Sequence, residues 1–226
     1  VEMAVLVGRI HKDNLEPYYR LLMEAVVEPA FLQEDLDRLK SQTLNYLENV
    51  LRYASDEELA KAVLYNEIFA GTPYGHLPVG TIEGVRSITL DDIRQFYRTH
   101  YTRDNVVIGV GGGFEPSLVE KLRADLGRLP PGKPELPPLP KLKPLQGVHV
   151  TIVEKDAPAA AISLGYQIDV LRGQPDWYPL ALANSWLGEH RSSSSHLFQV
   201  IREARGLNYG DYSYIEHFPQ GGQRQM

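Results

Sequence analysis

The residues best suited to chemistry gather near the end of the chain, in HLFQVIREARGLNYGDYSY, residues 196–214. Arg202 and Tyr209 lie seven residues apart within it, and both side chains can donate hydrogen bonds to a substrate oxygen. Periodicity alone predicts a helix ending at Gly206, where a left-handed conformation turns the chain into a tyrosine-rich strand. On that basis Arg202 would form a salt bridge on the helix, and Tyr209 would be a buried strand aromatic.

Other candidate motifs point to local structure instead of chemistry. Glu189, His190 and His196 lie close together in GEHRSSSSH, but the serines between them favour a flexible loop that caps the next helix. None of the seven histidines belongs to an H-E-x-x-H or H-x-x-E-H motif. The GVGGGF stretch fails the G-x-G-x-x-G pattern, and the chain has neither a phosphate-binding P-loop nor a G-x-S-x-G elbow.

Composition narrows the function classes further. The 226 residues carry a formal net charge of -6 without a block of like charge, which argues against nucleic-acid binding. No apolar run approaches the roughly 18 residues needed to span a membrane. The absence of cysteine excludes disulfides, thiolate metal sites and a cysteine nucleophile, but it fits either a cytoplasmic or a periplasmic location. The chain starts at Val1 and ends without closing an element, so we expect it to be part of a longer protein.

Hydrophobic periodicity predicts an α+β fold. Apolar spacing at three and four residues favours helices, and β-branched runs favour strands. The predicted helices cover residues 15–28, 33–54, 56–70, 89–101, 115–129, 176–188 and 195–206, and the predicted strands cover 1–10, 105–112, 147–155, 159–168 and 207–218. Seven prolines in residues 130–144 predict an extended linker and therefore a domain boundary.

Four stretches, in order, resemble the insulinase/pitrilysin family of zinc metallopeptidases, which includes the mitochondrial processing peptidases. EPAFLQEDLDRLKSQ is similar to the helix that follows the family's N-P-x-F turn, and GTPYGHLPVGTIEGV to its HPYG-type loop. SITLDDIRQFYRTHYTRDNVVIGVGG resembles a family hallmark segment. SSHLFQVIREARGLNY resembles the S-x-L-F-x-x-[LI]-R-E-x-R-G-L-x-Y signature of the second homologous domain.

The resemblance implies two homologous α+β domains, each a mostly antiparallel sheet packed by helices. Residues 1–128 would form the C-terminal part of the first domain and residues 129–146 the Pro-rich linker. Residues 147–226 would form the N-terminal part of the second, inactive-type domain. The linker predicted from proline content falls where the family joins its domains.

The resemblance also implies a zinc-dependent mechanism, with an H-x-x-E-H helix supplying two zinc ligands and a general base. That helix would lie before Val1, so no zinc is expected on this chain alone. Counting from Phe31 places the family's third ligand at Tyr46, and Glu48 is the nearest carboxylate, turned about 200° away on a helix. The family's substrate-binding arginine and tyrosine match Arg202 and Tyr209, which would hold the substrate backbone and its oxyanion.

Three functions follow from this resemblance. The first is a zinc-poor subunit that contributes Arg202 and Tyr209 to hydrolysis of unfolded peptides, together with a zinc-bearing homologous subunit or within a homodimer. The second is a self-sufficient zinc metalloendopeptidase that uses Glu48 as its third ligand. The third is a non-catalytic structural or assembly subunit. Bacterial relatives occur in both cytoplasm and periplasm, so the compartment stays open.

Overall fold

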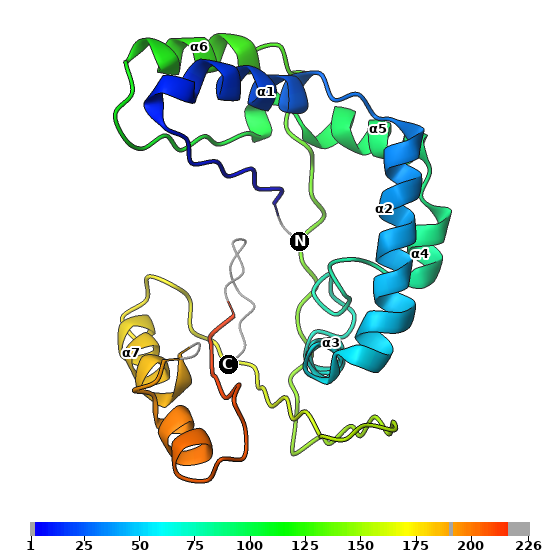
Figure 1. Ribbon diagram of the computed structural model, residues 1–226, viewed down its shortest axis with the longest axis vertical. Coiled ribbons are helices and arrows are strands. Elements are labelled where there is room, and N and C mark those ends of the chain that lie inside the picture. Colours follow the sequence, from blue (N-terminus) through cyan, green and yellow to red (C-terminus); the bar gives the residue numbers. More distant parts are fainter. Residues whose placement is uncertain (1–2, 190–191, 217–226) are drawn as a thin grey trace. The chain divides into compact units, whose positions relative to one another are not determined.

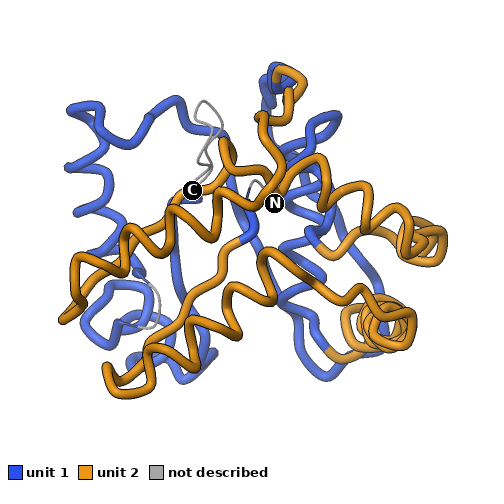
Figure 2. The backbone as a smooth tube through the Cα atoms, turned by 90° about the horizontal axis from the view of Figure 1, so that it is seen from above, with its two compact units in different colours: residues 1–4, 55–78, 139–226 blue, residues 5–54, 79–138 orange. Residues whose placement is uncertain are grey.

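A computed structural model describes residues 3–189 and 192–216 of the chain. The chain divides into two compact units, drawn in different colours in Figure 2. Unit 1 comprises residues 1–4, 55–78 and 139–226, and unit 2 comprises residues 5–54 and 79–138. Each unit is therefore assembled from segments that are distant in the sequence.

Both units are built from helices, and these lie close to their predicted positions except for the unpredicted α4 and the short η1 and η3 (Figure 1). Unit 2 contains η1 (Lys12–Asn14), α1 (Leu15–Val27), α2 (Gln33–Asn45), the π-helical η2 (Tyr46–Ala54), α4 (Ile82–Ser87), α5 (Leu90–His100), η3 (Arg103–Asn105) and α6 (Ser117–Leu126). Unit 1 contains α3 (Asp56–Ile68), α7 (Trp177–Gly188) and the π-helical η4 (Phe198–Glu203).

The core of unit 2 forms where α1 and α6 lie side by side (Figure 1). Tyr19 and Met23 of α1 pack with Leu126 and Leu129 at the end of α6. Apolar residues at three- and four-residue spacing give each helix one face that is removed from water, and burying that face stabilises the pair. Tyr97 of α5 joins this cluster and donates its hydroxyl to the carbonyl of Val26 at 2.8 Å.

Local sequence signals explain how several of these helices begin and end. Thr89 and Asp92 form a reciprocal capping box at the start of α5. Beyond the end of α1, Phe31 adopts a φ of 48°, a left-handed conformation that is costly for a residue with a side chain. The Phe31 ring packs edge-on against Tyr97 at 5.3 Å, and this contact stabilises the strained turn into α2.

The core of unit 1 forms around the end of α3. Phe69 is fully buried and packs with Ile68 and Tyr74. Leu139 and Leu142, from the Pro-rich part of the chain, cover this cluster. The segment 130–144 has no regular secondary structure, as its proline content predicted. The predicted domains 1–128 and 147–226 with their linker 129–146 rest on the family resemblance and stay a prediction.

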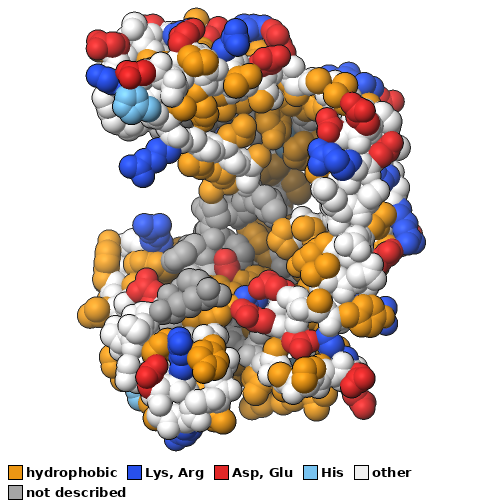
Figure 3. All heavy atoms as spheres, viewed as in Figure 1, with side chains coloured by type: hydrophobic (Ala, Val, Ile, Leu, Met, Phe, Trp, Pro, Cys, Tyr) orange, Lys and Arg blue, Asp and Glu red, His pale blue; other side chains and the backbone are white. Residues whose placement is uncertain are grey.

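The predicted α+β class with antiparallel sheets is wrong for this structure. The described residues form helices and no strand ladder; they include isolated bridge positions, among them the parallel bridge between Glu189 and Ser213. The described residues of the five predicted strands lie almost entirely outside regular secondary structure, and some of their apolar side chains are very exposed: Val107 is 97%, Val148 91% and Ile162 90% exposed. Hydrophobic side chains are accordingly visible over wide parts of the surface in Figure 3. A β-branched run shows that a segment can be extended, but a strand also needs a neighbouring backbone to pair with.

Candidate functional site

The helix η4 carries Arg202 near its end, and Gly206 then reverses the chain. Gly206 adopts a φ of 64°, as predicted, and its N–H donates to the carbonyl of Arg202 at 2.8 Å. The N–H of Leu207 donates to the carbonyl of Ile201 at 3.2 Å. The two bonds resemble those of a Schellman motif, in which a glycine ends the helix, but each bond spans one residue more. The longer span suits the π-helical hydrogen bonding of η4. The turn brings the chain after Gly206 back towards Arg202.

Arg202 and Tyr209 meet across this turn. The guanidinium carbon lies 4.7 Å from the centre of the Tyr209 ring and 4.6 Å from the centre of the Phe198 ring. Glu203 adds a longer ion pair, with 4.0 Å between its Oε1 and the Nε of Arg202. The guanidinium is thus held by two aromatic faces, an arrangement that favours a delocalised cation. Contrary to the prediction from periodicity alone, Tyr209 is not buried, since 78% of it is exposed.

Side-chain hydrogen bonds hold the loop that carries Tyr209. The Oδ1 of Asn208 accepts from the backbone N–H of Tyr209 at 2.7 Å and from that of Gly210 at 3.1 Å. The Nδ2 of Asn208 donates to the Oδ1 of Asp211 at 2.7 Å. Asparagine commonly stabilises tight turns by bonding to nearby backbone groups in this way.

The helix α7 anchors the next part of the segment through Ser213. The N–H of Ser213 donates to the carbonyl of Gly188 at 2.6 Å, and its hydroxyl donates to the Oδ1 of Asn184 at 2.7 Å. Asn184 is buried, so these bonds satisfy a polar group removed from water. A side chain at Gly188 would meet Leu197 and the backbone of Ser213, which explains why glycine suits this close approach.

The helix α3 anchors the remainder of the segment. Tyr212 donates its hydroxyl to Glu57, and the ammonium of Lys61 lies 5.1 Å from the centre of the Tyr212 ring. Further along α3, the hydroxyl of Tyr65 donates to Glu216 and lies 3.3 Å from the hydroxyl oxygen of Tyr214. Tyrosines 212 and 214, predicted to alternate along a strand, therefore contact a helix.

The electrostatics of this contact keep the tyrosines neutral and the lysine charged. Burial raises the pKa of Tyr65, and its hydrogen bonds with Glu216 and Tyr214 raise it further. Burial also raises the pKa of Tyr212, with an added contribution from the hydrogen bond to Glu57. For Lys61, burial acts to lower the pKa, but hydrogen bonds with Glu57, Tyr212 and Glu58 outweigh it and raise the pKa overall. Neutral phenols can therefore donate to the carboxylates throughout the ordinary pH range.

Glu48, the carboxylate considered as a zinc ligand, forms an ion pair instead. It lies in η2, and its Oε1 is 2.6 Å from the Nη2 of Arg86. In the described parts of the chain, no three histidine, aspartate or glutamate side chains come close enough to share a metal ion. The described residues therefore do not fit a zinc site of the family's kind, and the assignment of Glu48 stays a prediction.

The predicted histidine cluster is partly outside the described residues, because His190 falls in the gap at 190–191. Glu189 accepts a hydrogen bond from the hydroxyl of Ser185 at 2.5 Å. His196 stacks on the Trp186 ring with 4.7 Å between the ring centres. These contacts give Glu189 and His196 local structural roles, as the serine-rich loop between them indicated.

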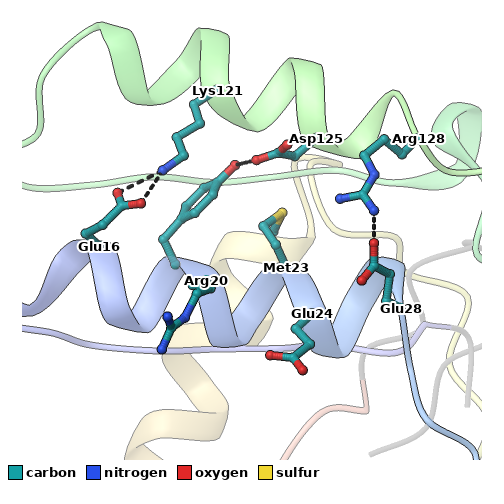
Figure 4. Close-up of a pocket in the computed structure, with 9 residues that line it drawn as sticks. Glu16, Arg20, Met23, Glu24, Glu28, Lys121, Asp125 and Arg128 are labelled. Carbon is teal, nitrogen blue, oxygen red and sulfur yellow. Dashed lines mark hydrogen bonds and ion pairs between the residues drawn. The ribbon is translucent and has the colours of Figure 1, made fainter.

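A groove of about 290 Å³ lies between α1 and α6 in unit 2 (Figure 4). Its charged groups largely satisfy one another: Lys121 donates to Glu16 at 2.6 Å, Tyr19 donates to Asp125 at 2.5 Å, and Arg128 pairs with Glu28. The groove is therefore best explained by the ion pairs that join the two helices.

The family resemblance singled out Arg202 and Tyr209, but sequence reasoning missed the groups around them. Phe198 precedes Arg202 by four residues, and that spacing on a helix places the two side chains together. The contacts of Tyr65 with Tyr214 and Glu216 join residues about 150 positions apart, so no local signal predicts them.

Comparison with known proteins identifies the family. Residues 87–224 match the family described as the peptidase M16 inactive domain, which covers more than half of the chain. The chain belongs to the peptidase M16 inactive-domain family. This confirms the metallopeptidase resemblance drawn from the four sequence stretches.

Several bacterial M16 relatives carry contrasting names. The chain is 27% identical over 213 residues to an uncharacterized zinc protease of Mycobacterium leprae, covering 93% of this chain and 47% of the relative. It is 29% identical over 207 residues to a protein of Helicobacter pylori named a non-peptidase homolog, covering 88% of this chain and 46% of the relative. The chain thus spans about half the length of these curated relatives.

Two solved bacterial structures share the fold. A crystal structure of a peptidase M16 inactive domain from Pseudomonas fluorescens matches with a TM-score of 0.72 at 25% identity, over 95% of this chain and 50% of that one. A protease structure from Helicobacter pylori matches with a TM-score of 0.69 at 17% identity, over 95% of this chain and 51% of that one. Among the described helices, none is both long and apolar enough to cross a membrane.

Proposed function

We propose that this M16 chain binds unfolded peptide through Arg202 and Tyr209 and supports hydrolysis by a zinc-bearing homologous subunit. The contact between the Arg202 guanidinium and the Tyr209 ring, 4.7 Å from carbon to ring centre, carries the proposal. It joins the two side chains that the family signature pairs, although seven residues separate them.

The geometry of the pair suits binding of a peptide carbonyl. A guanidinium that stacks on aromatic rings keeps its N–H donors around its edge, where they remain directed at groups in its own plane. Tyr209 is exposed, and its hydroxyl is a further donor for the same carbonyl oxygen. Donors that are fixed before the substrate arrives stabilise negative charge that develops on a carbonyl oxygen, because they need little rearrangement during the reaction.

The zinc ion is assigned to a partner because Tyr46 stands where the family resemblance places the third ligand, and tyrosine is not a plausible replacement for that ligand. When bound to that partner, zinc would activate water and polarise the scissile carbonyl. The residues of this chain would bind the peptide, orient its backbone and donate hydrogen bonds to its carbonyl oxygen. The relative named a non-peptidase homolog is consistent with a chain that works in this supporting role.

The test is reconstitution of peptide cleavage. The protein would be purified with and without a zinc-bearing M16 homologue from the same genome and assayed with an internally quenched unfolded peptide. We expect cleavage only with both proteins, and a loss of roughly a hundredfold in kcat/KM for Arg202→Ala. Full cleavage by this protein alone, with stoichiometric zinc, would contradict the partner requirement and favour a self-sufficient peptidase.

A non-catalytic assembly subunit is the second candidate, and one observation favours it. Arg202 is already engaged by Phe198, Tyr209 and Glu203, so these contacts could serve only to stabilise the turn at Gly206. That function predicts that Arg202→Ala and Tyr209→Phe alter stability but leave the cleavage rate of the assembly unchanged.

A further inference from the structure

The position of Tyr209 depends on the backbone around it more than on packing of its ring. Its side chain is 78% exposed, and residues 207–216 form no strand ladder that would hold them in place. Contacts with neighbouring helices therefore determine where this segment lies. Those contacts come from α7 at Ser213 and from α3 at three further positions.

The contacts with α3 follow a regular register. Glu57, Lys61 and Tyr65 are spaced four residues apart and therefore lie along one face of the helix. Tyr212, Tyr214 and Glu216 alternate along the segment, and the side chain of each contacts this face of α3. Four residues of a helix rise about 6 Å, and two residues of an extended chain rise about 6.6 Å. The spacing of the three residues on α3 therefore matches the spacing of the three residues on the segment.

The pairing is chemically specific at both ends. Near the start of α3, Tyr212 donates to Glu57 while Lys61 lies over its ring. Nearer the end of α3, Tyr65 donates to Glu216. Sliding the segment by two residues would move Tyr209 by about 6.6 Å and would break both hydrogen bonds.

Tyr65 is well suited to hold this register because its own position is fixed. Its ring packs against the fully buried Phe69, with 5.8 Å between the ring centres. Its hydroxyl therefore projects from the core of unit 1 towards the segment. Removing that single oxygen would release Glu216 and Tyr214 while keeping the ring packed.

We infer that Tyr65 is a positioning residue, which through Glu216 and Tyr214 sets where Tyr209 lies relative to Arg202. The inference rests on the proposed function of the Arg202 and Tyr209 pair. It assigns to α3 a role in peptide binding although no residue of α3 belongs to that pair.

The test is Tyr65→Phe in the reconstituted cleavage assay, with Tyr19→Phe as the matched control. Tyr19 also donates its hydroxyl to a carboxylate, Asp125, but it belongs to unit 2. We expect kcat/KM to fall by about tenfold to a hundredfold for Tyr65→Phe, since small displacements of a binding group have large kinetic effects. Tyr19→Phe should leave kcat/KM within about twofold of the wild type, as expected when binding geometry is unchanged.

Two further measurements separate positioning from a merely structural role. In the Tyr209→Phe background, Tyr65→Phe should cause little further loss, because the group that it positions is already absent. Amide hydrogen exchange across residues 207–216 should quicken in Tyr65→Phe and not in Tyr19→Phe. Glu216→Ala approaches the same hydrogen bond from its other end and should reproduce both effects.

Each contrary result has a distinct meaning. Two results would overturn the positioning role of Tyr65 and leave the proposed function standing. In the first, Tyr209→Phe lowers kcat/KM but Tyr65→Phe does not. In the second, the losses from the two substitutions multiply in the double variant. If Arg202→Ala and Tyr209→Phe both leave cleavage unchanged, the proposed function fails, and the positioning role fails with it.

Discussion

At the scale of single residues, the planar guanidinium of Arg202 is the feature on which the proposed function depends. It contacts two aromatic rings at once, and a lysine ammonium in its place would lack both the flat surface and the forked donors. Arginine and lysine are therefore not equivalent at this position, although they carry the same charge.

We predict that Arg202→Lys weakens binding of a fluorescently labelled unfolded peptide by several-fold to about tenfold, as loss of stacking and of a charged hydrogen bond implies. Fluorescence anisotropy would measure the change. Arg205→Lys is the matched control, because Arg205 lies in the same region but donates to the backbone carbonyl of Val200, outside the Arg202 and Tyr209 pair. Equal effects of the two substitutions would show that charge alone matters.

Asp92 provides a residue-scale prediction of acid sensitivity. Hydrogen bonds from the hydroxyl and then the backbone N–H of Thr89 lower the pKa of Asp92 below its usual value. The unfolded carboxyl has a pKa of about 3.9, so the stabilisation is present above that pH and is lost as the pH falls through the lower folded value. We predict that, below about pH 4, the midpoint of unfolding falls less steeply with pH in Asp92→Asn than in the wild type. Parallel curves for the two proteins would contradict this, and the effect should be small because Asp92 is exposed.

Local sequence predicted some features of single residues, and others came only from the family resemblance. Gly206 was correctly expected in a left-handed conformation, since glycine at a helix end favours it. The pairing of Arg202 with Tyr209 was suggested only by the family signature, because periodicity assigned the two residues to separate elements. Their roles in peptide binding stay proposals, as does that of Glu48.

At the scale of elements, the approach of α7 to the segment after η4 depends on Gly188. A Cβ atom there would lie 2.7 Å from the Cδ1 of Leu197 and 3.0 Å from the backbone nitrogen of Ser213. The leucine can move, but the backbone nitrogen is held by its hydrogen bond to the carbonyl of Gly188 itself.

We predict that Gly188→Ala lowers the free energy of unfolding by about 1–3 kcal/mol, the usual cost of overpacking. Urea denaturation would measure it. Gly113→Ala serves as the control, because a Cβ atom at Gly113 meets nothing within 4 Å. If both variants unfold at the same urea concentration as the wild type, the close approach at Gly188 does not constrain the segment.

Helices were predicted well and sheets were not, for one physical reason. A helix satisfies its backbone within each turn, so the spacing of Leu36, Leu39 and Thr43 was enough to place α2. A strand needs a partner that the local sequence does not identify, and the segments 147–155 and 159–168 form no ladder. The contacts of segment 207–216 with α3 could not be predicted because they join distant parts of the chain.

At the scale of the whole molecule, membership of the M16 inactive-domain family is established, and the activity of the protein is proposed. The relatives include proteins named zinc proteases and one named a non-peptidase homolog. Family membership therefore does not decide between an active peptidase, a supporting subunit and a structural subunit. The distinction depends on whether Arg202 and Tyr209 contribute to cleavage catalysed with zinc from elsewhere.

The most direct test compares kcat/KM for an unfolded peptide between the wild-type assembly and assemblies that carry Arg202→Ala or Tyr209→Phe, at saturating zinc-bearing partner. The account predicts that Arg202→Ala lowers kcat/KM by roughly a hundredfold, as expected when a donor to a developing oxyanion is lost. Tyr209→Phe should lower it in the same direction, and neither variant should change the zinc content of the partner. Unchanged kcat/KM in both variants would contradict the account.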